Sequence, residues 1–170
     1  SSGSCSVSGI GQARQEINKQ SKMALALTLA DPVCNDFAFY ATACIGKMTD
    51  VQFFTIYRRI SRGVFANKED FPKSAANKKP VFDDELVERA RRNHQNDLEN
   101  IIPFILVGGF YVLTKPDPKT ALWHFRVFFL SRVIHTITYQ TGLQPLRGIS
   151  FLVGVGTTLS MMYQVFKATY

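Results

Sequence analysis

The sequence has few cysteines and none of the short motifs that bind nucleotides or metals. Its three cysteines, Cys5, Cys34 and Cys44, have neither a metal-binding spacing nor the even number that a disulfide framework needs. GxGxxG, the Walker phosphate loop, HExxH and CxxC are all missing. These absences exclude the usual dinucleotide, nucleoside-triphosphate and zinc sites, and we expect no metal. The cysteines are predicted to be ordinary thiols.

An excess of one charge sign is present instead. Twenty Lys and Arg against thirteen Asp and Glu leave a net charge of +7, which favours an anionic partner. Nucleic acid, anionic lipid and a small acidic ligand all fit that charge. The most basic segment, 58–80, lacks the regular interleaving of aromatic side chains that base stacking uses. We therefore do not predict nucleic-acid binding.

Hydrophobic residues make up 46% of the chain and gather in four segments of helical length. The segment 148–166 has no charge and is long enough to cross a bilayer. Segments 33–57 and 121–139 are apolar with a few polar residues, and 101–113 is extended by the amphipathic stretch before it. We predict an all-α, four-helix transmembrane bundle. A soluble four-helix bundle is the alternative, but it leaves the uncharged 148–166 segment unexplained.

Polar and basic stretches divide the chain. Residues 1–22 are polar and Gly/Ser-rich and are predicted to be a disordered N-terminal extension, followed by a four-span membrane domain over 23–170. Asp117 is expected to cap the third helix, with Pro118 at its first position. By the positive-inside rule, the basic loop 58–80 lies in the cytosol, and the turn at 140–147 lies on the same side. Polar ends of several helices would then converge at that face.

The segment 87–104 places charged residues directly against an apolar run. Four polar side chains share one stripe of the predicted helix: Arg89, Arg92, Asn96 and Glu99. The pairs 85–89 and 88–92 are spaced for ion pairs along a solvated helix, and such structural pairing is one interpretation. The other is a polar ligand site, because the stripe continues into the apolar half.

The third helix carries a second polar face, made of Arg132, His135, Thr136 and Tyr139. Together with Arg147 it suits an anion, because a buried arginine needs one. A hydrogen-bonded core role for the histidine is the alternative. Lys47 and Asp50 are predicted to form a structural ion pair in the first helix. The combined set suits a zwitterion with more than one carboxylate, since arginines clamp carboxylates and Glu99 would take an ammonium group.

Several segments together resemble one known family. VERARRNHQNDLENIIPF (87–104) is similar to the signature of the MAPEG membrane proteins, and within them to the microsomal glutathione transferase 1 type. RRISRGVFANKED (58–70), GGFYVLTKPDPKTALWHFRVF (108–128), SRVIHTITY (131–139) and FLVGVGTTLSMMY (151–163) extend the likeness. The resemblance covers about residues 31–167.

This resemblance implies a homotrimer in the membrane lipid of the endoplasmic reticulum or outer mitochondrial membrane, with glutathione bound between subunits near the cytosolic face. It implies conjugation of glutathione to hydrophobic electrophiles and reduction of lipid hydroperoxides. Arg147 would stabilise the thiolate. The implied glutathione-contacting residues are Arg59, Arg92, His94, Asn96, Glu99, His135 and Tyr139. Supporting or structural roles are implied for Arg89, Arg132, Asp70, Lys47 and Asp50.

The chain departs from related patterns at four places. The prostaglandin E synthase branch has serine at the position of Gly148 and arginine at that of Gln95, so this chain points away from a prostaglandin isomerase. Phe71 stands where the transferase type often has a thiol-sensor cysteine, and the turn before Arg147 looks one residue shorter. A prostaglandin isomerase and a non-catalytic membrane adaptor, whose arginine cluster is purely structural, remain the alternatives.

Overall fold

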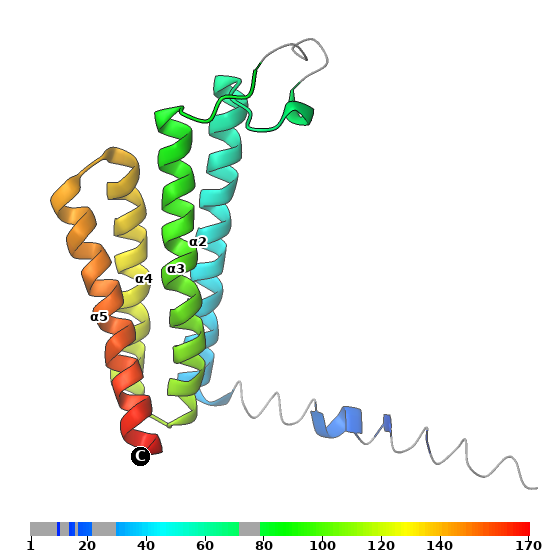
Figure 1. Ribbon diagram of the computed structural model, residues 1–170. Coiled ribbons are helices and arrows are strands. Elements are labelled where there is room, and N and C mark those ends of the chain that lie inside the picture. Colours follow the sequence, from blue (N-terminus) through cyan, green and yellow to red (C-terminus); the bar gives the residue numbers. More distant parts are fainter. Residues whose placement is uncertain (1–9, 11–13, 16, 22–29, 72–78) are drawn as a thin grey trace, which may run out of the picture.

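Four long helices account for most of the described chain. The computed structural model describes residues 10, 14–15, 17–21, 30–71 and 79–170. The helices are α2 (Pro32–Arg62), α3 (Glu85–Leu113), α4 (Pro118–Thr141) and α5 (Gln144–Thr169), with a short 3₁₀ turn, η1 (Lys68–Asp70), between α2 and α3. They run alternately up and down as a bundle (Figure 1). The predicted all-α, four-helix class is confirmed.

Local capping residues determine where the helices begin and end. Asp31, Asp84 and Asp117 each precede a helix, and each carboxylate accepts a hydrogen bond from a backbone N–H of the first turn. Gly63 and Gly142 follow α2 and α4 with φ of 63° and 78°, the left-handed conformation that ends a helix at little cost for glycine. The prediction that Asp117 caps the third helix is therefore confirmed.

The helices differ modestly from the predicted segments. α2 continues to Arg62, so the first part of the predicted basic loop is helical. α3 passes through Pro103 without ending, and this proline is on the exposed side of the helix. Most of residues 1–22 lie outside the described part of the chain. Those that are described there have exposed helical backbone, and the boundary of the N-terminal extension stays a prediction.

Aromatic rings fill the interior of the bundle from the end where α2 begins to its middle. Phe104 of α3 and Phe128 of α4 are fully buried and stack in parallel, with ring centroids 3.8 Å apart. Phe125 packs edge-on against Phe104. Gly108 of α3 allows Phe37 of α2 to approach so closely that any Cβ at that position would overlap the ring. Apolar packing of this kind sets the distance between the helices in this part of the bundle.

The helices are arranged so that α3 and α4 form the centre. α3 contacts α2, α4 and α5, and α4 contacts α2, α3 and α5, whereas α2 and α5 do not touch within the described chain. Large apolar side chains cover the outside of every helix, for example Phe53, Leu106, Leu130 and Leu152. Among the described helices, α5 is the one that is long and apolar enough, by length and composition, to cross a bilayer. An apolar exterior of this extent is typical of a surface that faces lipid.

Candidate functional site

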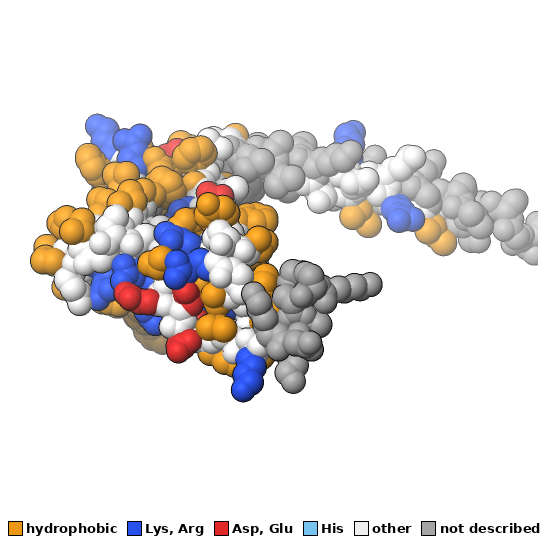
Figure 2. All heavy atoms as spheres, turned by 90° about the horizontal axis from the view of Figure 1, so that it is seen from above, with side chains coloured by type: hydrophobic (Ala, Val, Ile, Leu, Met, Phe, Trp, Pro, Cys, Tyr) orange, Lys and Arg blue, Asp and Glu red, His pale blue; other side chains and the backbone are white. Residues whose placement is uncertain are grey.

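Polar side chains gather at one end of the bundle. The start of α3, the end of α4 and the start of α5 meet there, beside the connection from α2 to α3 (Figure 1). Figure 2 looks down on this end and shows basic and acidic side chains clustered over the helices, with apolar side chains around them. The predicted convergence of polar helix ends is therefore present in the fold.

Arg132 of α4 is the centre of this site. Its side chain is completely buried, and one guanidinium nitrogen, Nη1, donates a hydrogen bond of 3.1 Å to Oδ1 of Asn96 on α3. The other two nitrogens, Nε and Nη2, are buried and have no hydrogen-bond partner within the described chain. The ring of Phe151 lies 6.0 Å from the guanidinium carbon. A buried cation with unsatisfied donors is costly unless an anion completes it.

The rings of His135 and Tyr139 lie between Arg132 on α4 and Arg147 near the start of α5. His135, one turn beyond Arg132, is 2% exposed, and its Nδ1 has no partner among the described groups. The ring of His135 lies 5.5 Å from that of Tyr139, and the guanidinium of Arg147 lies 4.9 Å from the Tyr139 ring. This last contact is a cation–π interaction that holds Arg147 at the mouth of the site. The fold thus brings together four of the predicted residues on α4 and α5.

Lys47 does not pair with Asp50, so that predicted ion pair is wrong. Nζ of Lys47 instead lies 2.6 Å from both carboxylate oxygens of Asp97 on α3. Asp50 is exposed on α2 and is paired with no lysine or arginine within the described chain. The reason is how the two helices are rotated about their axes. Asp97 of α3 is completely buried facing Lys47 of α2, and a buried charge requires a partner. The pair joins two helices, and the structural role predicted for Lys47 stays a prediction.

The charged start of α3 contains surface ion pairs, as the structural interpretation predicted, but one partner differs. Arg89 pairs with Glu85, and its Nη1 also reaches the carbonyl of Gln140 at the end of α4, at 3.5 Å. Glu88 pairs with Arg91 at 2.8 Å. The predicted 88–92 pair is therefore wrong, because Glu88 bonds the arginine three residues along the helix. This leaves Arg92 exposed on the stripe.

Several predicted residues are not brought into contact with the buried centre. Arg92 and Glu99 are exposed on α3, where Glu99 accepts a hydrogen bond from Gln95 at 3.3 Å. His94 is half-buried, with Nδ1 unpartnered among the described groups. Arg59 is half-buried near the end of α2, and exposed Asp70 accepts a hydrogen bond from the side chain of Asn67. In a single chain, the site is thus divided between a buried part and an exposed part.

Two buried polar residues of α3 were missed as candidates. Asn93 and Asp97 are completely buried, and neither polar atom of the Asn93 side chain has a partner in the described structure. Their spacing carried a usable signal. Positions 93, 97, 101 and 104 follow the helical repeat of the apolar face, so the two polar residues share the buried side with Ile101 and Phe104.

A groove adjoins this end on the outside of the bundle. It lies between α2 and α4, has a volume of about 470 Å³, and is lined by Val51, Phe54 and Ile137 together with Lys47 and Asp50. Thr136 and Gln140 also line it, and each has a buried polar atom without a partner among the described groups. The groove therefore combines apolar walls with unused hydrogen-bonding capacity.

The fold and site define a class of protein, a four-helix membrane bundle with a buried arginine centre at one end, and the comparisons identify its family. The MAPEG family model matches residues 37–167. The chain belongs to the MAPEG family. It is 49% identical over 148 residues to microsomal glutathione S-transferase 1 from Homo sapiens, covering 85% of this chain and 96% of that protein.

Two further relatives come from two branches of the family, one a transferase and one a synthase. The Mus musculus microsomal glutathione S-transferase 1 is 50% identical over 136 residues, or 78% of this chain and 88% of that protein. Prostaglandin E synthase from Macaca fascicularis is 34% identical over 143 residues, or 82% of this chain and 92% of that protein. The predicted family is confirmed, and the chain is more similar to these transferases than to that synthase.

Proposed function

We propose that this chain is a membrane-bound glutathione S-transferase that conjugates glutathione to hydrophobic electrophiles. The relatives at 49% and 50% identity carry that name over most of the chain, which supports the predicted class of enzyme. The prostaglandin E synthase relative is more distant, at 34% identity. This order favours the transferase over the isomerase.

The buried guanidinium of Arg132 is the observation that carries the proposal. Two of its nitrogens have no hydrogen-bond partner within the described chain, and the neighbouring carboxylate of Asp97 is already bonded to Lys47. The cluster of Lys47, Asp97 and Arg132 therefore has one uncompensated positive charge. Glutathione brings two carboxylates and a thiol that ionises. An anionic group of this ligand would offset the cost of burying the arginine.

The remaining contacts are assigned on the same basis. We propose that Asn96, His135 and Tyr139 line the buried part of the glutathione site, because they adjoin Arg132 and Arg147. Arg59, Arg92, His94 and Glu99 would form the outer part. In a homotrimer with the ligand between subunits, the exposed side chains of Arg92 and Glu99 would face a neighbouring subunit, which accounts for their exposure in one chain.

The chemistry requires activation of the thiol and little else. A free thiol with a pKa of about 8.5 is only a few per cent ionised at pH 7. A cation beside the sulfur stabilises the thiolate, and we assign this role to Arg147, which Tyr139 holds in place. The thiol proton leaves to water, the sulfur forms a bond to the electrophilic carbon, and the leaving group departs with its electron pair. No nucleophile from the protein is needed.

The same activated sulfur supports reduction of lipid hydroperoxides. The thiolate attacks the terminal peroxide oxygen, the O–O bond breaks, and the alkoxide takes a proton from water and leaves as the alcohol. The thiol of a second glutathione then attacks the sulfur of the resulting sulfenic acid, which gives the disulfide and water. An apolar substrate would arrive from the bilayer, since the outer faces of all four helices are apolar. We further propose that four spans place this end of the bundle in the cytosol, in the endoplasmic reticulum or outer mitochondrial membrane.

Calorimetric titration of the detergent-solubilised protein with glutathione tests the proposal. We expect saturable binding that Arg132→Leu weakens by about a hundredfold, because buried charge-assisted hydrogen bonds contribute roughly 1.5–3 kcal/mol each. Arg126→Leu is the matched control, since exposed Arg126 of α4 bonds the hydroxyl of Tyr40 away from the site. A wild-type protein without saturable glutathione binding would instead be a membrane adaptor.

Product assays separate the two enzymatic alternatives. Purified protein should conjugate chlorodinitrobenzene in the presence of glutathione, and incubation with the prostaglandin endoperoxide should give no glutathione-dependent isomerisation. The reverse result would assign the chain to the isomerase branch of its family.

A further inference from the structure

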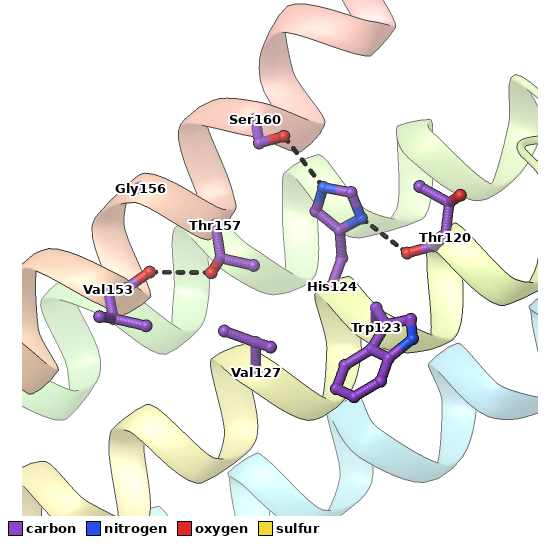
Figure 3. Close-up of a pocket in the computed structure, with 8 residues that line it drawn as sticks. All are labelled: Thr120, Trp123, His124, Val127, Val153, Gly156, Thr157 and Ser160. Carbon is purple, nitrogen blue, oxygen red and sulfur yellow. Dashed lines mark hydrogen bonds between the residues drawn. The ribbon is translucent and has the colours of Figure 1, made fainter.

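A second polar site lies in the other half of the bundle, on the outer face between α4 and α5. Nε2 of His124 lies 2.9 Å from Oγ of Ser160, and Nδ1 lies 2.8 Å from the backbone oxygen of Thr120 (Figure 3). His124 is eleven residues before His135, or about 16 Å along α4 at 1.5 Å per residue. The glutathione site therefore does not account for this pair.

The pair stands at one end of a pocket of about 490 Å³. Thr120, His124 and Ser160 line its polar end, near the start of α4, and Val127 and Val153 line the part that lies deeper along the helices (Figure 3). The two ends are about 10 Å apart, the rise of seven helical residues. Gly156 leaves the wall open, because a Cβ there would meet no atom within 4 Å. The volume falls in the range of pockets that bind small molecules.

The hydrogen bonds of this site leave acceptors rather than donors free. A carbonyl only accepts, so Nδ1 of His124 carries a proton, and in the tautomer with the proton on Nδ1 alone Nε2 accepts from the hydroxyl of Ser160. The hydroxyl of Thr120 donates to Asp117, and that of Thr157 donates to the backbone oxygen of Val153. Apart from the exposed indole of Trp123, no side-chain donor that lines the pocket remains, whereas Ser160 still has lone pairs to offer.

The pocket is polar at one end and apolar at the other, as one leaflet of a bilayer is polar at its surface and apolar at its centre. Its polar end is near Pro118, where α4 begins beside Lys115, Asp117 and Lys119, and its apolar end points toward the middle of the span. None of the eight lining residues is Asp, Glu, Lys or Arg, so nothing there would pair with an ionic headgroup. The matching ligand is uncharged, has one hydrogen-bond donor at one end, and is otherwise apolar.

We propose that this pocket binds a membrane sterol, whose hydroxyl donates to Ser160 and whose ring system lies along Trp123, Val127 and Val153. A sterol has one hydroxyl and no other polar group, which fits a site with free acceptors and few donors. Diacylglycerol also has a hydroxyl, but its two ester carbonyls would meet no matching side-chain hydroxyl donors. The sterol is therefore the occupant that the hydrogen-bond inventory favours.

Photo-crosslinking in reconstituted membranes tests this site. The full chain is reconstituted in phosphatidylcholine nanodiscs that contain a photoreactive cholesterol analogue, and labelled peptides are located by mass spectrometry. We expect saturable labelling of α4 and α5 around Trp123 and Ser160 that unlabelled cholesterol suppresses. Cholesterol 3-methyl ether, which lacks the donor, should compete about tenfold less well.

Two glycine variants provide a matched comparison. Gly156→Leu fills the pocket and should reduce labelling about tenfold. Gly109→Leu introduces the same side chain on α3, where a Cβ also meets no atom within 4 Å, and should leave labelling unchanged. Glutathione conjugation by both variants shows that they have folded.

Three results would overturn the proposal: labelling that cholesterol does not suppress, equal labelling of wild type and Gly156→Leu, or suppression by diacylglycerol but not by cholesterol. A crosslink between two copies of the chain through Trp123 would also overturn it, because the pocket would then be covered by protein.

Discussion

Lys47 of α2 donates hydrogen bonds to both carboxylate oxygens of Asp97 on α3, each at 2.6 Å, and thereby joins two helices inside the bundle. The carboxylate is completely buried, and the lysine side chain is only 12% exposed. Asp97 directly follows Asn96, the hydrogen-bond acceptor of Arg132. The ion pair therefore supports the segment of α3 on which the buried arginine depends.

Removing one partner of this pair should destabilise the protein strongly. Lys47→Met leaves the Asp97 carboxylate buried without a counter-charge, at a cost of about 3–5 kcal/mol in the free energy of unfolding. The double variant Lys47→Met/Asp97→Leu should be more stable than either single one, because no charge is then buried. Thermal unfolding in detergent, followed by circular dichroism, measures the stability of the wild type, the two single variants and the double variant. Additive losses would show that the two residues act independently.

A methyl group at Gly154 should displace Arg132. A Cβ at this α5 position would lie 2.8 Å from the hydroxyl oxygen of Ser131, 3.3 Å from Nε of Arg132 and 3.4 Å from Nη2. Gly154→Ala should therefore weaken glutathione binding about tenfold, since ordering at a binding site is sensitive to small shifts. Gly156→Ala, two residues along in open space, is the control. Equal affinities for the two variants would mean that the position of Arg132 does not matter for the ligand.

Loss of the Arg147 charge should reduce ionisation of bound glutathione. An adjacent arginine lowers the pKa of an acidic group by roughly 1–3 units. Arg147→Ala should accordingly cut the thiolate fraction at pH 7 by about tenfold or more, while Arg147→Lys retains part of it. Ultraviolet absorbance of the bound thiolate is the measurement, and Arg126→Ala is the control. If Arg147→Ala forms as much thiolate as wild type, another group activates the sulfur.

Stability in acid should depend on Asp84, the cap of α3. Nε of Arg62 donates to its carboxylate at 2.7 Å, and this bond, together with that from the backbone N–H of Val87, lowers the pKa of Asp84. Since the folded pKa is below the unfolded value, the contribution is complete above about pH 4 and is lost as the pH falls through the folded pKa. Asp84→Asn should flatten the pH dependence of thermal unfolding in this range. If the variant loses stability in acid as steeply as the wild type does, carboxylates other than that of Asp84 cause the loss.

Much of the fold was predictable because its determinants are local. Asp117 and Pro118 specify the start of α4 from within a few residues, and the length of an apolar run is read directly from the chain. The clustering of Arg132, His135 and Tyr139 was also predictable, because residues spaced by three and four share a helix face. The family follows from long matching segments. These predictions required no knowledge of how the helices pack.

The pairing of charges was not predictable in the same way. Both errors, Lys47 with Asp50 and Glu88 with Arg92, assumed a partner at a standard spacing on the same helix. Spacing limits which partners are possible but does not choose among them. Glu88 took a different neighbour on its own helix, whereas Lys47 took a partner on another helix.

The sequence by itself determined four helices, the cap at Asp117 and a polar end on α3, α4 and α5, since each depends on interactions within a few residues. The tertiary structure alone decided that Lys47 meets Asp97, fifty residues away, and that two nitrogens of Arg132, beside Asn96, have no partner among the residues described. It also decided that His124 and Ser160 meet on the outer face of the bundle. These relationships depend on the rotation and spacing of packed helices, which the burial of Phe104, Phe128 and Gly108 sets.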